Sequence, residues 1–140
     1  MSHSLKIATI LPYKENYSFL KAQAAAIWVC DFYKYSKFKD DNFIFGNTKG
    51  SDYLTKNYIN IKINNLKSKF SSSTNEYCKN FIKKTKNDKF DIIEIHNRPL
   101  VFNYLNKEIN SKYILYFHND PLSMNGSKSI SERLKLLDEL

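Results

Sequence analysis

Two clusters of polar side chains stand directly after apolar, strand-like runs, and they hold the residue types of this chain best suited to binding and proton transfer. The first cluster follows the run 91–95 and the second follows the run 113–117. The clusters comprise His96, Asn97, Arg98, His118, Asn119 and Asp120. A short helical pattern separates the two runs, so both should end at the same edge of a parallel sheet, where open α/β sheets bind ligands. The spacing predicts one site built from both clusters.

These side chains have chemical roles and structural alternatives. Arg98 suits a phosphate or an anionic sugar because its planar guanidinium forms paired hydrogen bonds, but it could instead form a salt bridge with Glu94 or Glu108. Asp120 could accept a hydrogen bond from a substrate hydroxyl, or it could close a turn before Pro121. Substrate contacts are also candidates for His96, Asn97 and Asn119, although a strand-to-helix turn uses such residues for local capping as well.

The charge of the chain favours an anionic partner that is not a nucleic acid. The formal net charge is +8, with the densest lysine run at 79–89. A solvated helix face is one explanation, and attraction to a membrane surface or to a phosphorylated substrate is the other. The only arginines are Arg98 and Arg133, whereas nucleic-acid readers usually carry a concentrated basic stripe.

Several common classes of protein do not fit. No run approaches the roughly 20 apolar residues of a membrane-spanning helix, and the start of the chain lacks a signal-peptide layout. Cys30 and Cys78 form no pair with metal-ligand spacing, so a zinc site is not expected. The two cysteines instead suit buried thiols in the reducing cytoplasm. The glycine-rich strings of nucleotide-triphosphatases and dehydrogenases and the serine elbow of hydrolases are missing.

The order of the elements predicts an α/β fold of the Rossmann-like, three-layer kind with a mainly parallel sheet of about five strands, ordered 3-2-1-4-5. The expected strands are 6–11, 43–46, 58–63, 91–95 and 113–117. The expected helices are 18–35, one that a capping box of Ser73 and Glu76 begins, 99–109, and one that Ser129 and Glu132 begin. In the first helix we expect Trp28 and the neighbouring aromatic residues to form core.

The last helix predicts an incomplete unit. Its apolar stripe, Leu134, Leu137 and Leu140, should pack against something, and in a doubly wound sheet the next element would be another strand. We therefore expect residues 1–140 to form a single domain that is truncated at its C-terminal end.

The strings that carry these elements resemble the N-terminal domain of a retaining glycosyltransferase with the GT-B fold, in the class called glycosyltransferase family 4. The resemblance covers nearly the whole chain and rests on the segments 6–12, 15–18, 24–29, 43–46, 91–99, 113–121 and 132–134. It departs from the family at 23–26, where family members often have paired glycines. The family's C-terminal domain, which carries most of the nucleotide-sugar site, is absent.

The resemblance implies half of a GT-B fold and the acceptor side of a sugar transferase. Such an enzyme moves a glycosyl group from a nucleotide-sugar to a cell-envelope glycan, as in lipopolysaccharide biosynthesis, or to a lipid-linked acceptor. It needs no cofactor or metal beyond the donor, and it works in the cytoplasm, with contact to the anionic inner face of the cytoplasmic membrane. This domain alone should be inactive. The alternative is a non-catalytic Rossmann-like module that binds a small anionic ligand.

The resemblance also implies roles for single residues. His118 matches a strand-end histidine that contacts the donor sugar or the reacting centre, so His118 and Asp120 are the catalytic candidates, although a histidine there can simply bond to a neighbouring main chain. Lys14 and Glu15 follow the first strand, where the family builds its acceptor side; a solvated loop is the alternative.

Overall fold

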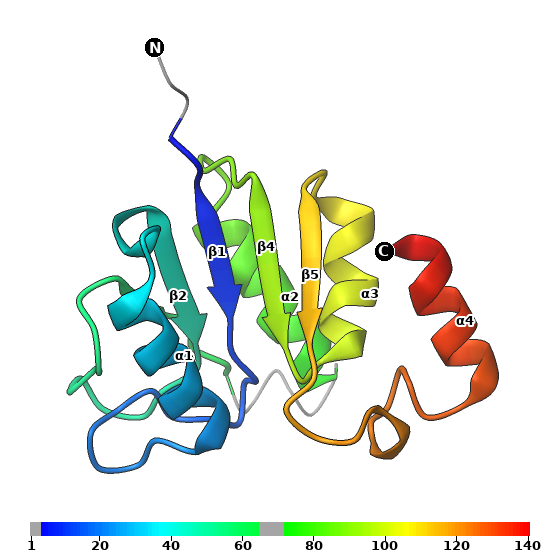
Figure 1. Ribbon diagram of the computed structural model, residues 1–140, viewed down its shortest axis with the longest axis horizontal. Helices are drawn as coiled ribbons and strands as arrows, with labels where there is room; N and C mark the ends of the chain where they lie inside the picture. The colour runs from blue at the N-terminus through cyan, green and yellow to red at the C-terminus, as the bar shows by residue number, and fades with distance from the viewer. Residues whose placement is uncertain (1–3, 65–71) are drawn as a thin grey trace.

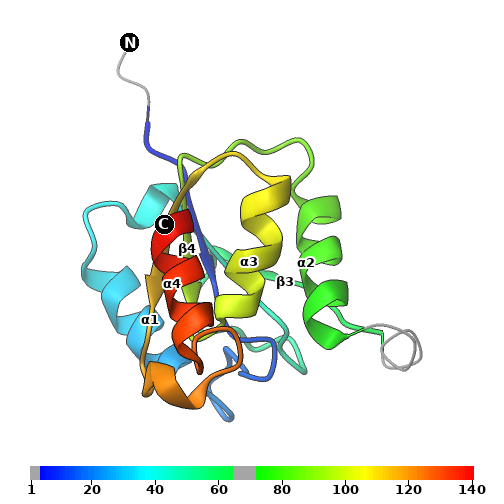
Figure 2. The same cartoon turned by 90° about the vertical axis from the view of Figure 1, so that its right-hand side faces the viewer.

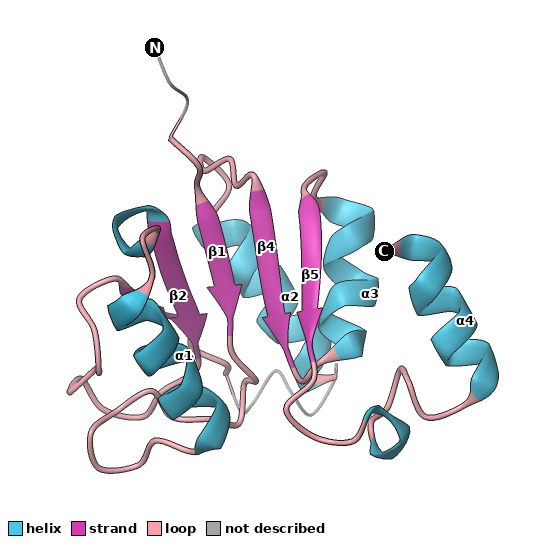
Figure 3. Ribbon diagram, viewed as in Figure 1, coloured by secondary structure: helices cyan, strands magenta, loops and turns pink. Residues whose placement is uncertain are grey.

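A five-stranded, fully parallel sheet forms the middle layer of the computed structural model, which describes residues 4–64 and 72–140 (Figures 1 and 3). The strand order is β3-β2-β1-β4-β5, so the predicted fold class and order are confirmed. All residues of β1 are buried, as a central strand covered on both faces requires. The strands are β1 (Ile7–Ile10), β2 (Asn42–Gly46), β3 (Tyr58–Asn60), β4 (Ile92–His96) and β5 (Lys112–Tyr116).

Helices cover the two faces of the sheet unequally. One face carries α1, and the other carries α2 and α3, with α4 standing outside α3 at the β5 end of the sheet (Figure 2). The helices are α1 (Ala24–Tyr35), α2 (Ser73–Lys84), α3 (Pro99–Glu108) and α4 (Ile130–Glu139), with short 3₁₀ turns η1 (Lys39–Asp41) and η3 (Pro121–Ser123). No helix in the described part of the chain is long and apolar enough to cross a membrane.

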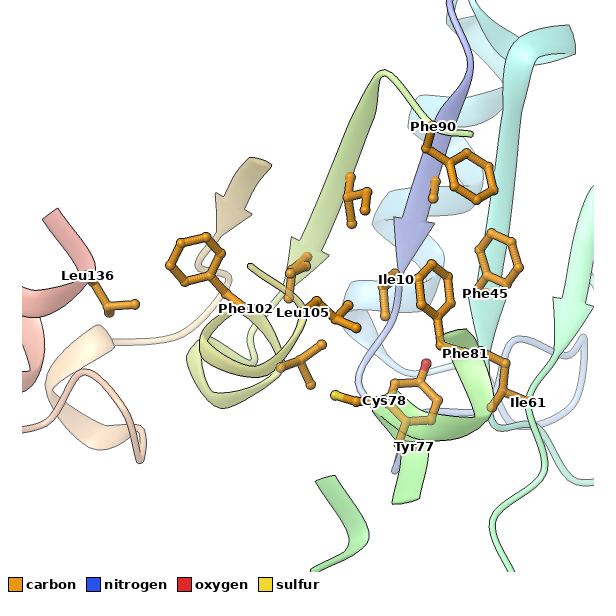
Figure 4. Close-up of a cluster of buried hydrophobic side chains, with 14 residues drawn as sticks. Ile10, Phe45, Ile61, Tyr77, Cys78, Phe81, Phe90, Phe102, Leu105 and Leu136 are labelled. Atoms are coloured by element: carbon orange, nitrogen blue, oxygen red, sulfur yellow. The ribbon is translucent and has the colours of Figure 1, made fainter. Parts of the chain in front are cut away.

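Each face of the sheet has its own hydrophobic core. The larger core lies under α2 and α3, where Phe45 and Phe81 meet edge to face and Leu136 of α4 also packs (Figure 4). The smaller core lies under α1 and includes Val29 and Ile44. This core reaches the sheet at Leu11 after β1, Ile44 of β2 and Tyr58 of β3, and over β5 the same face carries an exposed residue, Ile114.

The first helix corrects two expectations. It begins at Ala24 instead of Ser18, because Ser18 pairs with Tyr53 in an isolated bridge and the chain turns before the helix. Its buried residues are the small ones, Ala25, Ala26, Val29 and Cys30. The expected core face is exposed instead: the accessible fraction is 39% for Trp28, 47% for Phe32 and 89% for Tyr35. Small side chains let the helix lie close to the sheet, which turns the large rings outward.

Among the later helices, the start of α2 differs from the expectation. There Ser72 is the N-cap and accepts from the N–H of Asn75, while Glu76 accepts from the N–H of Asn64 and so forms no capping box with Ser73. The capping box of Ser129 and Glu132 is present at α4. The third strand ends at Asn60, earlier than expected, and lies at the sheet edge as its alternating pattern predicts.

Candidate functional site

A cleft of about 580 Å³ opens at the carboxyl edge of the sheet, to which the strand arrows in Figure 1 point. This volume lies in the range of small-molecule sites. The loops that follow β1, β4 and β5 all contribute to it. Of the predicted site residues, those that line the cleft are Lys14, Glu15, Asn97, Arg98 and Asn119.

Asn97 joins the ends of the two neighbouring strands. Its N–H donates to the carbonyl oxygen of Tyr116 at 2.8 Å, and its side-chain Oδ1 accepts from the N–H of His118 at 2.7 Å and of Asn119 at 3.3 Å. Its φ of 53° lies in the left-handed region, which asparagine tolerates better than most residues. The residue is buried, so its amide is a structural tie between the loops that follow β4 and β5.

Arg98 is held in the cleft wall with donor capacity to spare. Its guanidinium lies over the ring of Tyr13, 5.4 Å from the ring centre, and one terminal nitrogen donates to the carbonyl oxygen of Asn97 at 3.3 Å. Its Nε is buried and has no hydrogen-bond partner among the described residues. Within that part of the chain Arg98 also forms no salt bridge with Glu94 or Glu108, the structural alternative that the sequence left open. A buried donor without a partner favours an anionic ligand beside it.

Glu15 caps a helix from a distance. Its Oε2 accepts from the N–H of Ala26 at 3.0 Å, in the first turn of α1, whose N-cap Gln23 makes no side-chain cap. Burial raises the pKa of the Glu15 carboxyl, and the hydrogen bond from Ala26 and the charge of Arg98 oppose that rise. Lys14 beside it is exposed at the cleft rim. The carboxylate is therefore engaged with the protein, which leaves Lys14 and Arg98 as the cations of the cleft.

Three helices begin at the cleft, a feature that the sequence analysis did not use. The wall includes Ala24 at the start of α1, Thr74 in the first turn of α2 and Pro99 at the start of α3. First-turn N–H groups lack intrahelical partners, and the helix dipole is positive at this end, so each start favours negative charge. The capping pattern before α2 and the proline that begins α3 were the available signals.

The two histidines meet, but outside the cleft. The Nδ1 of His96 lies 2.7 Å from the Nε2 of His118, and the rings stack with centres 5.0 Å apart. Both rings also pack against Trp28 and Tyr116 on the α1 face of the sheet. His96 is fully buried and His118 half-buried. The two imidazoles are thus together, as expected, but they form a ring-to-ring contact beneath Trp28 and do not open into the cleft.

The pair is held neutral, and its geometry favours one tautomer. Burial, and then the neighbouring His118, lower the pKa of His96 to about 3, and burial lowers the pKa of His118. The Nε2 of His96 is buried without a partner among the described residues. A proton placed there would be an unpaired buried donor, so the proton of His96 belongs on Nδ1, from which it is donated to His118.

Asp120 has the local role that the sequence offered as its alternative. Its side chain accepts from the N–H of Leu122 at 2.9 Å and caps η3, and the residue is exposed outside the cleft lining. Asn119 lies in the lining, where its Oδ1 accepts from the Nδ2 of Asn97 at 3.4 Å.

No cluster of side chains within residues 4–64 and 72–140 could hold a metal ion. The cleft joins the cations Arg98 and Lys14 to the starts of three helices, and at two of these starts a first-turn N–H is already bonded, to Glu15 and to Ser72. Comparison with known proteins adds no family to this description: no protein-family model, no curated protein and no solved structure matches the chain.

Proposed function

We propose that the cleft binds a phosphorylated or otherwise anionic sugar, and that the chain is the acceptor-side domain of a sugar transferase. The observation that carries the proposal is Arg98, whose partly unpaired guanidinium lies in a cleft that three helix starts also line. Arginine with helix N-terminal N–H groups is a recurrent arrangement for phosphate. The sugar-transfer part rests on the resemblance of the segments 91–99 and 113–121 to glycosyltransferase family 4.

The proposed reaction uses a nucleotide-sugar donor and a cell-envelope glycan or lipid-linked acceptor, at the inner face of the cytoplasmic membrane. The net charge of +8 supports a location beside an anionic membrane surface. In this scheme Arg98 and Lys14 bind the anionic group, while Asn97 and Asn119 shape the wall between the two strand ends.

A non-catalytic module for a small anionic ligand is the second candidate. It is favoured by the positions of His118 and Asp120, which lie outside the cleft lining. In a transferase that contains this domain, replacing a catalytic His118 by alanine would slow transfer by a factor of about 100 to 1000. An unchanged transfer rate would leave His118 with a structural role beside His96.

The binding proposal is tested by titration of the chain with glucose 1-phosphate, followed by amide NMR and calorimetry. We expect chemical-shift changes at the starts of α1 and α3, and an affinity at least about tenfold lower for Arg98→Ala, because a hydrogen bond to a charged group contributes about 1.5–3 kcal/mol. Arg133→Ala is the matched control, since Arg133 donates to main-chain carbonyl groups of Ser127 and Lys128, and none of these three residues lines the cleft. Equal affinity in both variants would refute the assignment.

A further inference from the structure

The loop between β5 and α4 carries an asparagine directly before a glycine, at Asn125 and Gly126, and this is the only such pair in the sequence. The two residues form the centre of a turn, because the N–H of Ser127 donates to the carbonyl oxygen of Met124 at 3.2 Å. Asn125 is exposed and lines the cleft, and its side chain forms no hydrogen bond within the described part of the chain. Its amide is therefore free to turn toward the neighbouring main chain.

Packing against the start of α3 requires glycine at position 126. The φ of Gly126 is 95°, a conformation that residues with a Cβ rarely adopt. A methyl group there would lie 3.1 Å from the Cβ of Pro99, whereas carbon atoms in contact are about 3.5–4.0 Å apart. It would also lie 3.2 Å from the main-chain nitrogen of Leu100. The fold thus keeps a residue without a side chain after Asn125, and nothing on that residue shields its nitrogen from the amide.

A carboxylate lies beside this nitrogen. The N–H of Gly126 donates to Oε1 of Glu132 at 3.1 Å, within the range of about 2.6–3.2 Å over which a general base can accept a proton. The hydrogen bond from the N–H of Ser129 lowers the pKa of the Glu132 carboxyl, which is therefore ionised at neutral pH. The capping box of α4 holds the same carboxylate in place. The loop thus brings together an amide, a nitrogen nucleophile and a base.

We propose that Asn125 is a site of spontaneous deamidation, which replaces its side-chain amide by a carboxylate inside the cleft. Glu132 takes the proton of the Gly126 N–H while the nitrogen attacks Cγ of Asn125, so a new C–N bond closes a succinimide ring. The bond between Cγ and Nδ2 breaks, and the departing NH₂ group takes that proton from Glu132 and leaves as ammonia. Water then opens the ring at either carbonyl group and returns a proton to the ring nitrogen, which gives an aspartyl or an isoaspartyl residue. No atom is oxidised or reduced.

The modification changes the charge of the cleft. A carboxylate at position 125 shares the cleft with Arg98 and Lys14, and it competes with a ligand anion for these two cations. The cleft therefore loses affinity as the molecule ages. This consequence rests on the anion binding proposed for the cleft, whereas the deamidation itself does not.

The modification is tested by incubation of the folded chain at neutral pH for several weeks, with its tryptic peptides followed by mass spectrometry. We expect Asn125 to convert while Asn110 keeps its amide. Asn110 is also exposed and precedes a small residue, Ser111, but no carboxylate among the described residues accepts from the N–H of that serine. Equal conversion at the two sites, or none at Asn125, would overturn the proposal.

The variant Glu132→Gln separates the base from the rest of the loop. Glutamine has nearly the same size and can also serve in a capping box, so the fold should be retained, which circular dichroism checks. We expect conversion at Asn125 to slow at least about tenfold, since a positioned general base commonly contributes about 100-fold or more. In concentrated urea both proteins should convert at the same rate. A folded variant as fast as the natural chain, or a difference that persists in urea, would contradict the role of Glu132.

Titration with glucose 1-phosphate tests the consequence for the cleft. Asn125→Asp should bind at least about tenfold more weakly than the natural chain, whereas Asn110→Asp adds the same charge outside the cleft lining and should bind equally well. Equal affinity of the two variants would refute the effect on the cleft. If the natural chain does not bind glucose 1-phosphate, the function proposed for the cleft fails, while mass spectrometry still decides the deamidation.

Discussion

Asn97 does more for the site than its neighbours because one amide group sets the positions of two loops. Its Oδ1 accepts from two consecutive N–H groups of the β5 loop, and its own main chain adopts a positive φ. The cleft residues Arg98 and Asn119 directly follow the two ends of this connection. Their separation therefore depends on Asn97, whose Oδ1 is already engaged by these two N–H groups.

Replacing Asn97 by glycine should lower the free energy of unfolding by about 1–3 kcal/mol, because two N–H groups lose their acceptor. Asn97→Ala should cost about 1 kcal/mol more, since alanine resists the positive φ that glycine adopts freely. Urea denaturation measures both. An alanine variant as stable as the glycine variant would show that the main-chain conformation is not strained there.

His96 should make stability depend on pH. Its pKa is lowered to about 3 in the folded chain from about 6.5, so between these pH values the unfolded chain binds a proton that the folded chain does not. The free energy of unfolding is therefore highest above pH 6.5. It falls as the pH is lowered toward 3, with a limiting slope of about 1.4 kcal/mol per pH unit.

Urea denaturation between pH 3 and 7 measures this slope. His96→Phe should reduce it by the contribution of one bound proton, about 1.4 kcal/mol per pH unit. The carboxyls of Glu15 and Glu94 have pKa values raised by burial and act in the opposite direction, but both remain in both proteins. The difference between the two curves therefore reports His96 together with any change in the titration of His118, which contacts it. Curves that run parallel would show that His96 titrates normally.

At the scale of the elements, the sheet could be predicted and the face of α1 could not. Strand runs such as 113–117 are short, rich in apolar residues and followed by polar ones, so their type, order and shared edge follow from general rules. The sequence of α1 is apolar almost all round, and periodicity then cannot say which side is buried. Close packing with the sheet decides it, and close packing depends on side-chain size across both elements.

Replacing residues on the two sides of α1 tests this orientation. Val29→Ala should lower the free energy of unfolding by about 2 kcal/mol, since two buried methyl groups are lost and a cavity remains. Ile27→Ala should cost less than about 1 kcal/mol, because Ile27 is 49% exposed. Thermal or urea denaturation of the two variants compares them, and a reversed order would mean that α1 is rotated.

The candidate site divides in the same way. Residues after the strand ends, such as Asn97 and Arg98, could be predicted to share a cleft because topology places them there. The contact between His96 and His118 beneath Trp28 could not, because it depends on which residue of α1 faces the β4–β5 side of the sheet. The side chain of His96 lies on the same face of β4 as that of Glu94, two residues earlier, and this alternation was the one signal available.

For the whole molecule, the cleft supplies binding groups from a single sheet edge. Transfer requires donor and acceptor to be positioned together, and under the proposed sugar-transferase function a second domain would hold the donor. We expect the 140-residue chain to bind glucose 1-phosphate but to transfer no sugar from a radiolabelled nucleotide-sugar to a lipid-linked acceptor. Turnover by this chain alone would contradict the half-site interpretation and would demand a donor site within these residues.

Because three helices start at the cleft, ligand binding there should be coupled to the stability of the fold. An anion held there would lie at the first turns of helices from both layers that flank the sheet. Unfolding of the domain would then require release of the ligand, so ligand occupancy would raise the free energy of unfolding. At a ligand concentration 100 times the dissociation constant, this linkage contributes about 2.7 kcal/mol to the free energy of unfolding. The bound anion would thus be a reversible stabiliser of the fold.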